Sequence, residues 1–421
     1  MEQAFDDEDR SLAAGLFSAV RDLSKAEQGV TRAAYSETET AVLRLIGSTA
    51  ESYGLTSRVD GAANLVVEMP EAVAEGPVTW VGSHVDSVAE GGNYDGLAGV
   101  VAGLLCVVKA KQQGLKLRRP LALVALRAEE AVWFGQMYIG SSALLGQLGP
   151  ADMLRPHRET GRMLRDCLEA VGADVENIAQ GISLVDPTTV GAWLELHIEQ
   201  GPQLVQRELP VGIVTGIRGS TRHRTVHCRG ASGHSGAVPR ADRRDSVLAM
   251  AHLMVAVDEE WKRLDSGGVD LVTTFGMVGT NPNEHAETRI PGDVSFSIDI
   301  RSRSRETIES FYQFFRAQCA SLEASRGVKF EFDERVIVEP AAVDEEWAQR
   351  FRDSSDGFGY GSMDILSGAG HDAAVFSYVG VPAAMVFVRN DGGSHNPGEQ
   401  MDLDDFMMGV EVLYNAIVSA P

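Results

Sequence analysis

The pattern of apolar and polar positions predicts a helical start followed by alternating strands and helices. From about Leu12 to Thr56, apolar residues return at helical spacing. Beyond Asn64, short apolar runs alternate with helical stretches, and the run 97–108 is typical of a buried helix. Four runs are predicted as strands: 78–81, 121–126, 192–196 and 384–388. This alternation predicts an α/β fold in which helices cover a mixed sheet.

The stretch between about 212 and 337 follows a different pattern. It predicts strands at 225–228, 271–277, 294–300 and 329–338, and helices at 245–264 and 306–325. This βαββαβ order is that of a ferredoxin-like α+β unit. We therefore expect a catalytic domain built from 1–211 and 338–421, with 212–337 inserted as a smaller domain.

Composition narrows the possible partners and compartments. The chain has 421 residues, with 37 Lys and Arg against 60 Asp and Glu, which gives a net charge of −23. Such an acidic protein repels phosphate backbones, so no nucleic-acid partner is expected. Four cysteines without a CxxC pair fit a reducing compartment. The acidic start Met1–Glu8 lacks the features of a secretory signal, and 97–108 is too short to span a bilayer. We expect a cytoplasmic protein without a membrane partner.

Histidine and acidic residues follow the predicted strands at the end where each strand stops. His84 ends the strand that begins at Val78, and a glycine-rich turn presents Asp95 eleven residues later. Sites in open α/β sheets gather at the carboxyl ends of strands. The candidates come from five separate segments: His84, Asp95, Glu129-Glu130, His197 and His395.

These residue types suit divalent metal ions. Imidazole and carboxylate ligands accept Zn, Mn, Co or Ni, and three histidines with two acids suffice for two ions that share one carboxylate. Two such ions can polarise a carbonyl together. In the adjacent pair Glu129-Glu130, one residue can bind metal while the other acts as general base. A single histidine at a strand end is more often structural, so the joint arrangement carries the metal hypothesis.

Eight motifs then point to a family. In chain order they are GSHVDSVAEGGNYDG (82–96), EE (129–130), HIEQGP (197–202), GHSGAVP (233–239), IPG (290–292), DIR (299–301), SGAGHDA (367–373) and GGSHNPGE (392–399). With these motifs the sequence resembles the aminoacylase-like dinuclear metallohydrolases, in the branch of N-carbamoyl-L-amino acid hydrolases, β-ureidopropionases and allantoate amidohydrolases. The resemblance covers nearly all of the chain beyond the N-terminal helices.

The resemblance implies a role for each candidate ligand. One of two divalent ions per chain would be bound by His84, Asp95 and His197, and the other by Asp95, Glu130 and His395. Glu129 would be the general base, and Asp86 would orient His84, as metal-bound imidazoles usually require. Related exopeptidases have a carboxylate in place of His197, which favours carbamoyl or ureido substrates over peptides.

The resemblance also implies substrate contacts and a homodimer. His234 would cross the dimer interface and stabilise the oxyanion, and Arg301 would bind the carboxylate of a small-molecule substrate. Gln200 and Gly393 are expected to be further substrate contacts. The inserted domain would be both the dimerisation surface and a lid that closes on the substrate. His371 fits a structural role as well as a functional one.

Several positions depart from the family pattern. Gly233 and Thr288 stand where the branch commonly has asparagine, Trp133 lies in Ala131–Phe134 where Gly-x-Arg-Phe is usual, and Arg218 replaces a small residue. We include Thr288 and Arg218 among the substrate-contact candidates. Among them, Trp133 and Arg218 are expected to reshape the substrate pocket for a bulkier, aromatic or doubly anionic N-substituted amino acid.

The sequence therefore predicts a metal-dependent amidohydrolase that cleaves a linear non-peptide C–N bond in an N-carbamoyl or ureido amino acid. An N-acyl amino acid amidase or dipeptidase is the alternative among enzymes. A catalytically inactive binding relative is the alternative from another class, and the complete set of candidate ligands and base argues against it.

Overall fold

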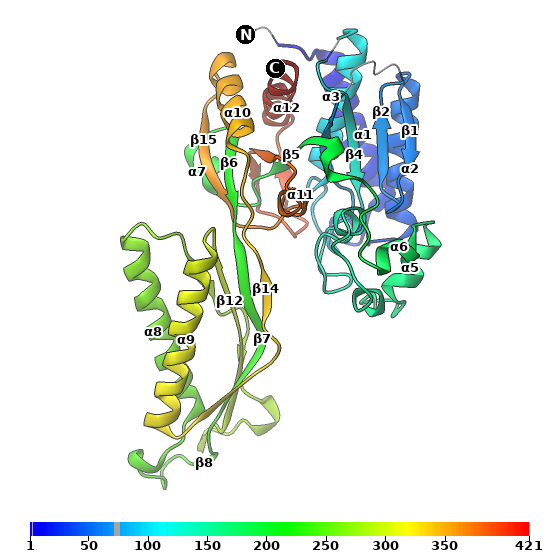
Figure 1. Cartoon of the computed structure of the whole chain (residues 1–421). Helices are drawn as coiled ribbons and strands as arrows, with labels where there is room; N and C mark the ends of the chain where they lie inside the picture. The colour runs from blue at the N-terminus through cyan, green and yellow to red at the C-terminus, as the bar shows by residue number, and fades with distance from the viewer. Residues whose placement is uncertain (2, 71–75, 116, 421) are drawn as a thin grey trace. The chain divides into compact units, whose positions relative to one another are not determined.

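The computed structural model describes residues 1, 3–70, 76–115 and 117–420 (Figure 1). The chain divides into two compact units. Unit 1 comprises Met1–Thr215 and Ala342–Pro421, and unit 2 comprises Gly216–Ala341. Unit 2 is thus inserted in the sequence of unit 1, with limits four residues beyond the expected positions 212 and 337.

Unit 1 is built on an eight-stranded mixed sheet with the order β1-β2-β4-β3-β5-β16-β6-β15. The neighbours β4, β3, β5 and β16 pair in parallel, whereas β1–β2, β2–β4 and β16–β6 are antiparallel. The strands are β1 (Thr56–Val59), β2 (Leu65–Glu68), β3 (Val78–His84), β4 (Leu121–Leu126), β5 (Val190–Ile198), β6 (Val211–Ile217), β15 (Ser362–Ser367) and β16 (Ala383–Val388). The mixed α/β sheet predicted from the sequence is therefore present.

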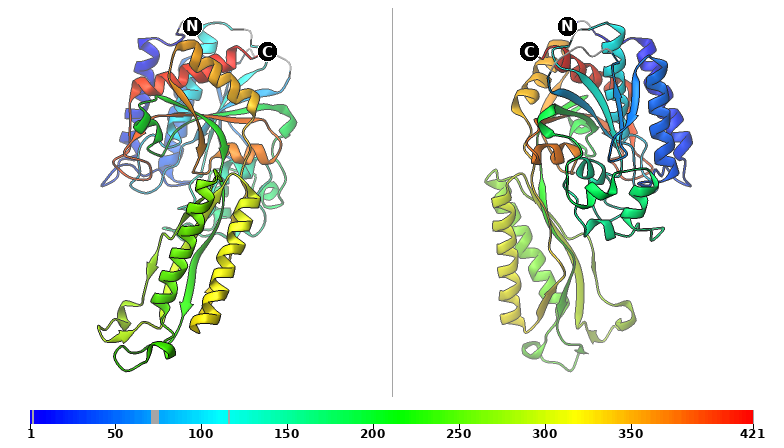
Figure 2. Two further views of the ribbon diagram at one scale, coloured as in Figure 1. Left: turned by 90° about the vertical axis from the view of Figure 1, so that its left-hand side faces the viewer. Right: turned by 45° about the vertical axis from the view of Figure 1, so that its right-hand side comes forward.

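Helices cover both faces of this sheet (Figure 2). Alternate residues of a strand point to opposite faces. On β5, Leu194 and Leu196 join the core beneath the long helices, whereas Trp193 stacks on Phe376 of α11 at a centroid distance of 4.1 Å. The longer helices are α1 (Asp7–Ser24), α2 (Glu37–Ser52), α3 (Leu97–Gln112), α10 (Glu345–Phe358) and α12 (Leu403–Val418), and the shorter ones α4 (Ile139–Leu144), α5 (Leu164–Ala170), α6 (Val175–Ala179), α7 (Gln203–Arg207) and α11 (Asp372–Tyr378).

Local sequence explains where these helices begin and why α3 is central. The side chain of Asp6 accepts the N–H groups of Glu8 and Asp9, and the side chain of Asp9 accepts the N–H of Asp6, which forms a capping box at the start of α1. Helix α3 is apolar on all sides and packs against β3, β4 and β5. A helix that is hydrophobic all round is stable when it is buried on all sides. It follows directly on the turn that contains Asp95 and so fixes one end of that turn.

Unit 2 is an antiparallel sheet with two long helices (Figure 2). The strand order is β10-β12-β7-β13, with β9 also paired to β12 and β14 to β7. Along β12, Val294, Phe296, Ile298 and Ile300 alternate with less buried residues and face the core. The elements are β7 (Gly219–Arg229), β8 (Gly233–His234), α8 (Ser246–Ser266), β9 (Val272–Thr274), β10 (Val278–Gly279), β11 (Arg289–Ile290), β12 (Asp293–Ser302), α9 (Arg305–Arg326), β13 (Lys329–Phe332) and β14 (Val336–Val338).

Two strands expected in unit 2 have other bounds in the structure. Of the stretch 271–277 only β9 is a strand, and β10 begins just beyond it, whereas 329–338 is split into β13 and β14. Between β13 and β14, the carboxylate of Asp333 accepts the N–H of Thr225 in β7, and the Asp333 N–H donates to the carbonyl of Thr225. Among the described residues, no helix is long and apolar enough to cross a membrane. All four cysteines are buried free thiols.

Candidate metal centre

The carboxyl ends of the four parallel strands bring the predicted ligands to one edge of the sheet. His84 ends β3, Glu129 and Glu130 follow β4, and His197 lies near the end of β5. His395 lies in the loop after β16, beyond the short strand β17 (Asn390–Asp391) and before β18 (Gln400–Met401). Neighbouring parallel strands end at the same edge, so residues far apart in sequence become neighbours.

A first ligand group consists of His84, Asp95 and His197. Nε2 of His84 lies 3.4 Å from Oδ1 of Asp95, and Nε2 of His197 lies 3.3 Å from the same oxygen. All three residues are buried, and their ligand atoms lie within 4.8 Å of one another. The first metal set expected from the sequence thus converges on one carboxylate oxygen.

A second group shares Asp95. Nε2 of His395 lies 3.5 Å from Oδ2 of Asp95 and 3.3 Å from Oε1 of Glu130. These three ligand atoms also lie within 4.8 Å of one another. The two oxygens of Asp95 thus face different groups, which is the arrangement needed for one carboxylate to join two cations.

The distances fit direct ligands of a divalent ion. At Zn–N and Zn–O bond lengths of about 2.0–2.2 Å, two ligands at the corners of a tetrahedron are about 3.3–3.6 Å apart. The four nitrogen–oxygen distances in the two groups are 3.3–3.5 Å. Imidazole nitrogen and carboxylate oxygen are also the donor types that Zn, Mn, Co and Ni accept. Both the spacing and the chemistry of the donors suit such ions.

Neighbouring carbonyl groups orient the two buried imidazoles. Nδ1 of His84 lies 3.1 Å from the carbonyl oxygen of Asp86, and Nδ1 of His197 lies 2.9 Å from that of Ile198. Each Nδ1–H can donate to its carbonyl, which leaves Nε2 of each ring on the side of Asp95, and Nε2 of His197 also accepts the N–H of Gly96 at 3.2 Å. Such partners fix the tautomer and orientation of metal-binding histidines.

Asp86 joins two of the strand ends. Its carboxylate accepts the backbone N–H of Glu129 at 2.9 Å and that of Glu130 at 3.0 Å. Oδ1 also lies 3.2 Å from Nδ1 of His84. The side chain of Asp86 is fully buried. Asp86 therefore lies where it can orient His84, and in addition it fixes the backbone that carries both glutamates.

The pKa shifts show that the carboxylates of the two ligand groups favour positive charge nearby. Burial raises the pKa of Glu129 well above its ordinary value. Hydrogen bonds to Asp95 and Glu130 raise the pKa of His395 to about 11. Burial opposes the charged forms of His84 and Asp95, but their hydrogen bonds outweigh it, so the pKa of His84 is raised and that of Asp95 is lowered. Several carboxylates buried together stabilise the protonated form of nearby imidazoles. A metal cation bound among them would be stabilised by the same negative charge.

Gln200, expected to contact substrate, lies against the shared carboxylate. Its Nε2 donates to Oδ2 of Asp95 at 2.7 Å, and the hydroxyl of Ser394 donates to the same oxygen. Oε1 of Gln200 is buried without a hydrogen-bond partner. Gly393 is adjacent to Ser394, and its carbonyl accepts from the side chain of Asn390. The structure thus places Gln200 against Asp95 with one buried acceptor atom that has no hydrogen-bond partner.

A third cluster, Glu195, His197 and His371, also has ligand atoms close together. The carboxylate of Glu195, however, already accepts from the Ser83 hydroxyl, the Trp193 indole and the Ala373 N–H. His371 is buried, and its Nε2 lies 2.8 Å from the Ser367 hydroxyl. These contacts support the structural role considered for His371.

In unit 2, His234 and Thr288 belong to two short paired strands and the turn beside them. β8 pairs with β11, so His234 is opposite Arg289, and the Ser235 N–H donates to the carbonyl of Thr288 at 2.8 Å. His234 is exposed, and its Nδ1 accepts the N–H of Gly236. The structure thus brings together two of the positions selected from the sequence.

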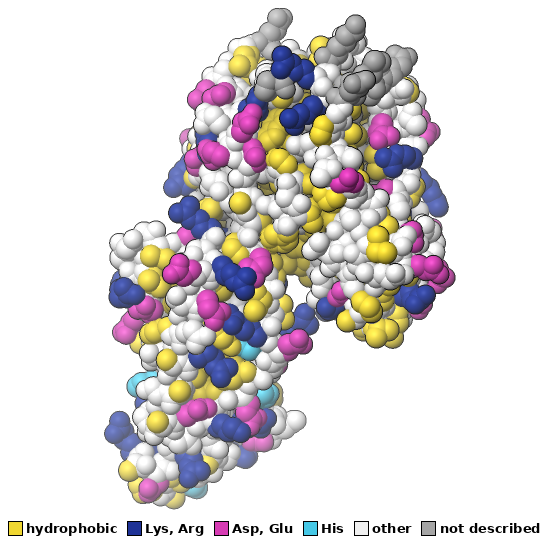
Figure 3. Space-filling view, in the orientation of Figure 1, with side chains coloured by type: hydrophobic (Ala, Val, Ile, Leu, Met, Phe, Trp, Pro, Cys, Tyr) yellow, Lys and Arg dark blue, Asp and Glu magenta, His cyan; other side chains and the backbone are white. Residues whose placement is uncertain are grey.

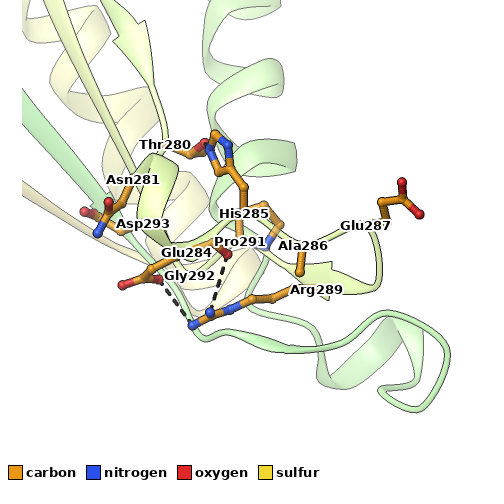
Figure 4. Close-up of a pocket in the computed structure, with 10 residues that line it drawn as sticks. All are labelled: Thr280, Asn281, Glu284, His285, Ala286, Glu287, Arg289, Pro291, Gly292 and Asp293. Carbon is orange, nitrogen blue, oxygen red and sulfur yellow. Dashed lines mark hydrogen bonds and ion pairs between the residues drawn. The ribbon is translucent and has the colours of Figure 1, made fainter.

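A cavity of about 330 Å³ lies beside this strand pair (Figure 4). It is lined by residues from 280 to 293, and Figure 4 shows Arg289 bonded to the carboxylate and carbonyl oxygen of Glu284. All of its lining residues belong to unit 2, and they include the apolar Ala286 and Pro291 beside polar residues such as Asn281 and His285. The cavity therefore belongs to unit 2 alone, and the histidine–carboxylate groups belong to unit 1.

Two arginines expected to contact substrate have acidic partners in unit 2. Arg301 is paired with Asp299, with Nη2 2.7 Å from Oδ2. Arg218 donates from Nε and Nη2 to Asp270, at 2.5–3.1 Å. The same Asp270 accepts the N–H of Arg303. Arg218 therefore has a structural partner, which the sequence pattern did not indicate.

Trp133, expected to reshape the substrate pocket, is buried beside the loop that follows His84. Its indole is 1% exposed, stacks on His157 and donates to the carbonyl of Ser87 at 2.9 Å. The indole therefore supports the loop after His84 from within the core.

The sequence interpretation missed several charged residues that contact the ligand loops. Glu399 is buried, and its carboxylate accepts the N–H groups of Tyr94 and Asp95 and the hydroxyl of Ser394. Burial raises its pKa to about 7. Glu399 lies within the motif 392–399, which was the one available signal. Two further charged residues, Arg32 and Glu39, precede every motif, so no motif could have indicated them.

Comparison with known proteins assigns the family. Residues 72–419 match the model of Peptidase family M20/M25/M40, so the chain belongs to this family. It is 32% identical to an N-carbamoyl-L-amino acid amidohydrolase of Geobacillus stearothermophilus over 390 residues, which are 92% of this chain and 93% of that protein. It is 31% identical to an allantoate amidohydrolase of Bacillus subtilis over 391 residues, 93% of this chain and 92% of that one.

A solved structure supports the same grouping. A hydantoinase/carbamoylase family amidase from Burkholderia multivorans superposes with a TM-score of 0.87 at 27% identity, and the match covers 97% of each chain. The family resemblance inferred from the motifs is thereby confirmed.

Proposed function

We propose that this protein is a metal-dependent amidohydrolase that cleaves a linear non-peptide C–N bond in an N-carbamoyl or ureido amino acid. The observation that carries the proposal is the position of Asp95, whose two carboxylate oxygens face His84 and His197 on one side and His395 on the other. The relatives named as N-carbamoyl-amino acid and allantoate amidohydrolases support the substrate class.

His84, Asp95 and His197 would hold one divalent ion, and Asp95, Glu130 and His395 a second. Such ions, Zn or alternatively Mn, Co or Ni, supply Lewis-acid polarisation of the carbonyl and lower the pKa of water. Glu129 takes a proton from the attacking water and returns it to the leaving nitrogen. The carboxylate of Asp86 accepts the backbone N–H groups of Glu129 and Glu130 and so fixes the position of both residues. A carbamoyl substrate then yields the amino acid, CO2 and ammonia.

We propose that Arg301, Gln200 and His234 recognise the substrate. Arg301 binds the substrate carboxylate through two parallel N–H donors. The unpaired Oε1 of Gln200 accepts an N–H of the ureido group, and His234 donates to the carbonyl oxygen as its negative charge develops. We include Thr288 and Gly393 as further contacts, whereas the pairing of Arg218 with Asp270 supports a structural role for Arg218.

We further propose that unit 2 is a lid and the dimerisation surface of a homodimer. Hydrophobic side chains lie between charged ones on its surface (Figure 3). Val247, Leu248, Met254 and Val255 form an exposed apolar stripe on α8, and Met277 and Val278 at edge strand β10 are also exposed. Helical residues at this spacing share one face, so the stripe can be buried against a second copy.

The proposed activity is tested by ammonia release. N-carbamoyl-L-amino acids, ureidopropionate and allantoate are offered to protein stripped with a chelator and then reloaded with Mn²⁺ or Zn²⁺. We expect release with at least one compound after reloading and none before it or with Glu129→Gln. N-acyl amino acids and dipeptides release an amino acid and no ammonia when they are hydrolysed, so they are assayed by the appearance of the free amino acid. Turnover of these compounds alone would favour the amidase or dipeptidase alternative. Bound metal without any turnover would favour a binding protein.

The crossing of His234 between subunits is tested with mixed dimers. His234→Ala and Glu129→Gln are each expected to be nearly inactive. If His234 serves the partner's site, random mixing restores about one quarter of wild-type activity, because half of the dimers have one complete site. Absence of recovery in a mixture shown to contain heterodimers would exclude the crossing.

A further inference from the structure

The segment before the family match contains two fully buried charged residues. The match begins at residue 72, whereas Arg32 and Glu39 lie between α1 and the first turn of α2. Both are 0% exposed. Isolated charges are costly to bury, so such side chains are retained where they are paired and hydrogen-bonded. Their partners are the loops that carry the candidate metal ligands.

Arg32 joins the two loops on either side of the first ligand group. Its Nε donates to the carbonyl of Val85 at 2.6 Å, between His84 and Asp86. Its Nη1 and Nη2 donate to the side chain and carbonyl of Asn93 at 3.3 and 3.4 Å, two residues before Asp95. One guanidinium therefore links the backbone beside His84 to the turn that presents Asp95.

The backbone around Arg32 follows the same loop. Arg32 exchanges hydrogen bonds with Ser87, and Val30 exchanges two with Gly91 at 2.9 and 3.0 Å. The hydroxyl of Thr31 accepts the N–H of Glu90. At Gly29, with φ +62°, a Cβ would lie 2.2 Å from the carbonyl oxygen of Gly91. This close approach requires glycine and keeps the segment against the ligand loop.

Charge attraction adds to these contacts. Burial lowers the pKa of Arg32 to about 10, while Glu399, Asp86, Asp95 and Glu130 act to raise it. At neutral pH Arg32 is therefore a cation among the carboxylates of the site. It offsets their mutual repulsion in the folded protein.

Glu39 fixes the other ligand segment. Its carboxylate accepts the N–H of Ala128 at 3.0 Å, the guanidinium of Arg127 and the N–H of Tyr35. Ala128 has φ +52°, a left-handed conformation that costs an L-residue roughly 1–2 kcal/mol and needs support from its surroundings. The next residues are Glu129 and Glu130. Glu39 therefore stabilises the backbone turn from which both project.

From these contacts we propose that Arg32 and Glu39 are positioning residues of the metal centre: Arg32 fixes the loops of His84 and Asp95, and Glu39 fixes the turn before Glu129 and Glu130. The inference rests on the proposed function in taking these as metal ligands and base. It makes the N-terminal segment 29–39 part of the catalytic centre, although that segment lies outside the family match.

The test compares Arg32→Met, Arg32→Lys and Glu39→Gln with two controls, Glu37→Gln and Arg44→Met, which change exposed residues of α2. Mn²⁺ affinity is measured by titration calorimetry on metal-stripped protein, at a temperature where circular dichroism shows each variant to be folded. Arg32→Met and Glu39→Gln are expected to bind Mn²⁺ about 10–100-fold more weakly than wild type, the usual effect of losing a residue that orients metal ligands. Arg32→Lys retains the charge, so its Mn²⁺ affinity should lie between the affinities of wild type and Arg32→Met. The controls should match wild type.

A second readout separates positioning from general stability. Thermal midpoints are recorded with and without saturating Mn²⁺. If the residues position the ligands, Mn²⁺ should raise the thermal midpoint of Arg32→Met and Glu39→Gln less than that of wild type. These variants should also have a lower kcat and a KM near the wild-type value. If the residues are merely structural, the thermal midpoints with and without Mn²⁺ should fall equally, and the increase caused by Mn²⁺, the Mn²⁺ affinity and kcat should be unchanged. That result would overturn the proposal. Wild-type protein that binds no Mn²⁺ would overturn it too, whereas binding without ammonia release would refute the proposed activity alone.

Discussion

A Cβ atom on residue 96 would lie 2.4 Å from the imidazole ring of His84. Gly96 has φ +67° and immediately precedes α3, so both its backbone conformation and the adjacent ring require glycine. Gly96→Ala should therefore displace His84 and reduce bound metal and kcat by at least about tenfold. Metal content after dialysis and ammonia release provide the measurement.

Gly114→Ala is a matched control at the other end of the same helix. Gly114 has φ +59°, but a Cβ added there would meet nothing within 4 Å. It carries a similar backbone penalty, about 1 kcal/mol, without the contact to His84. Equal metal content in the two variants would contradict the steric explanation.

Asp86→Asn should weaken metal binding while leaving the ligands themselves unchanged. An amide cannot accept from both Glu129 and Glu130 as the carboxylate does, because its NH2 group would oppose one N–H. We expect Mn²⁺ affinity to fall about 10–100-fold and the thermal midpoint to fall as well. Asp186→Asn changes an exposed aspartate that caps Thr188 and should affect neither metal binding nor turnover. Unchanged Mn²⁺ affinity in Asp86→Asn would contradict this role.

Arg301→Lys should raise KM for substrates that have a carboxylate and have little effect on KM for substrates that lack one. Lysine keeps the charge but cannot make two parallel bonds, so KM for an N-carbamoyl amino acid should rise about tenfold or more, and KM for its neutral amide analogue should change little. Arg305→Lys alters an exposed ion pair with Glu339 and serves as the control. A similar rise in KM for both substrates would exclude a carboxylate contact.

The pair Arg218–Asp270 predicts a pH-dependent contribution to stability. Burial alone would raise the pKa of Asp270, but hydrogen bonds from Arg218 and from the Arg303 N–H outweigh it and lower the pKa below 3.8. The ionised carboxylate therefore favours the folded state. Its contribution is present above the unfolded-state value and is lost as the pH falls through the folded-state pKa.

Asp270→Asn and Arg218→Met are accordingly expected to lower the thermal midpoint at pH 7 by about 2–4 °C for each kcal/mol lost. For Asp270→Asn, the difference from wild type should shrink as the pH is lowered below 4. Glu260→Gln removes an exposed pair with Arg263 on α8 and should change the midpoint by less than about 2 °C. If Arg218→Met instead raises KM at an unchanged midpoint, Arg218 contacts the substrate.

Local sequence was sufficient to predict the main elements and to select the candidate ligands. Uninterrupted apolar runs of strand length locate β4, which has the predicted bounds 121–126, and a longer run locates the buried α3. The residue types at the strand ends single out His84, Asp95, Glu130, His197 and His395, because parallel strands meet at one edge. Hydrophobic period and strand polarity are local properties, so they can be read without the fold.

The polar groups that support that site are determined by the packing of segments that are distant in the sequence. Arg32 and Glu39 belong to a segment that looks like an ordinary helix start, yet folding buries them against Val85, Asn93 and Ala128. In the same way Arg218 meets Asp270, and Trp133 meets Ser87. Hydrogen bonds between distant segments depend on the approach of particular atoms to within about 3 Å. No period or motif within one segment encodes that approach, and it is fixed only when the whole core packs.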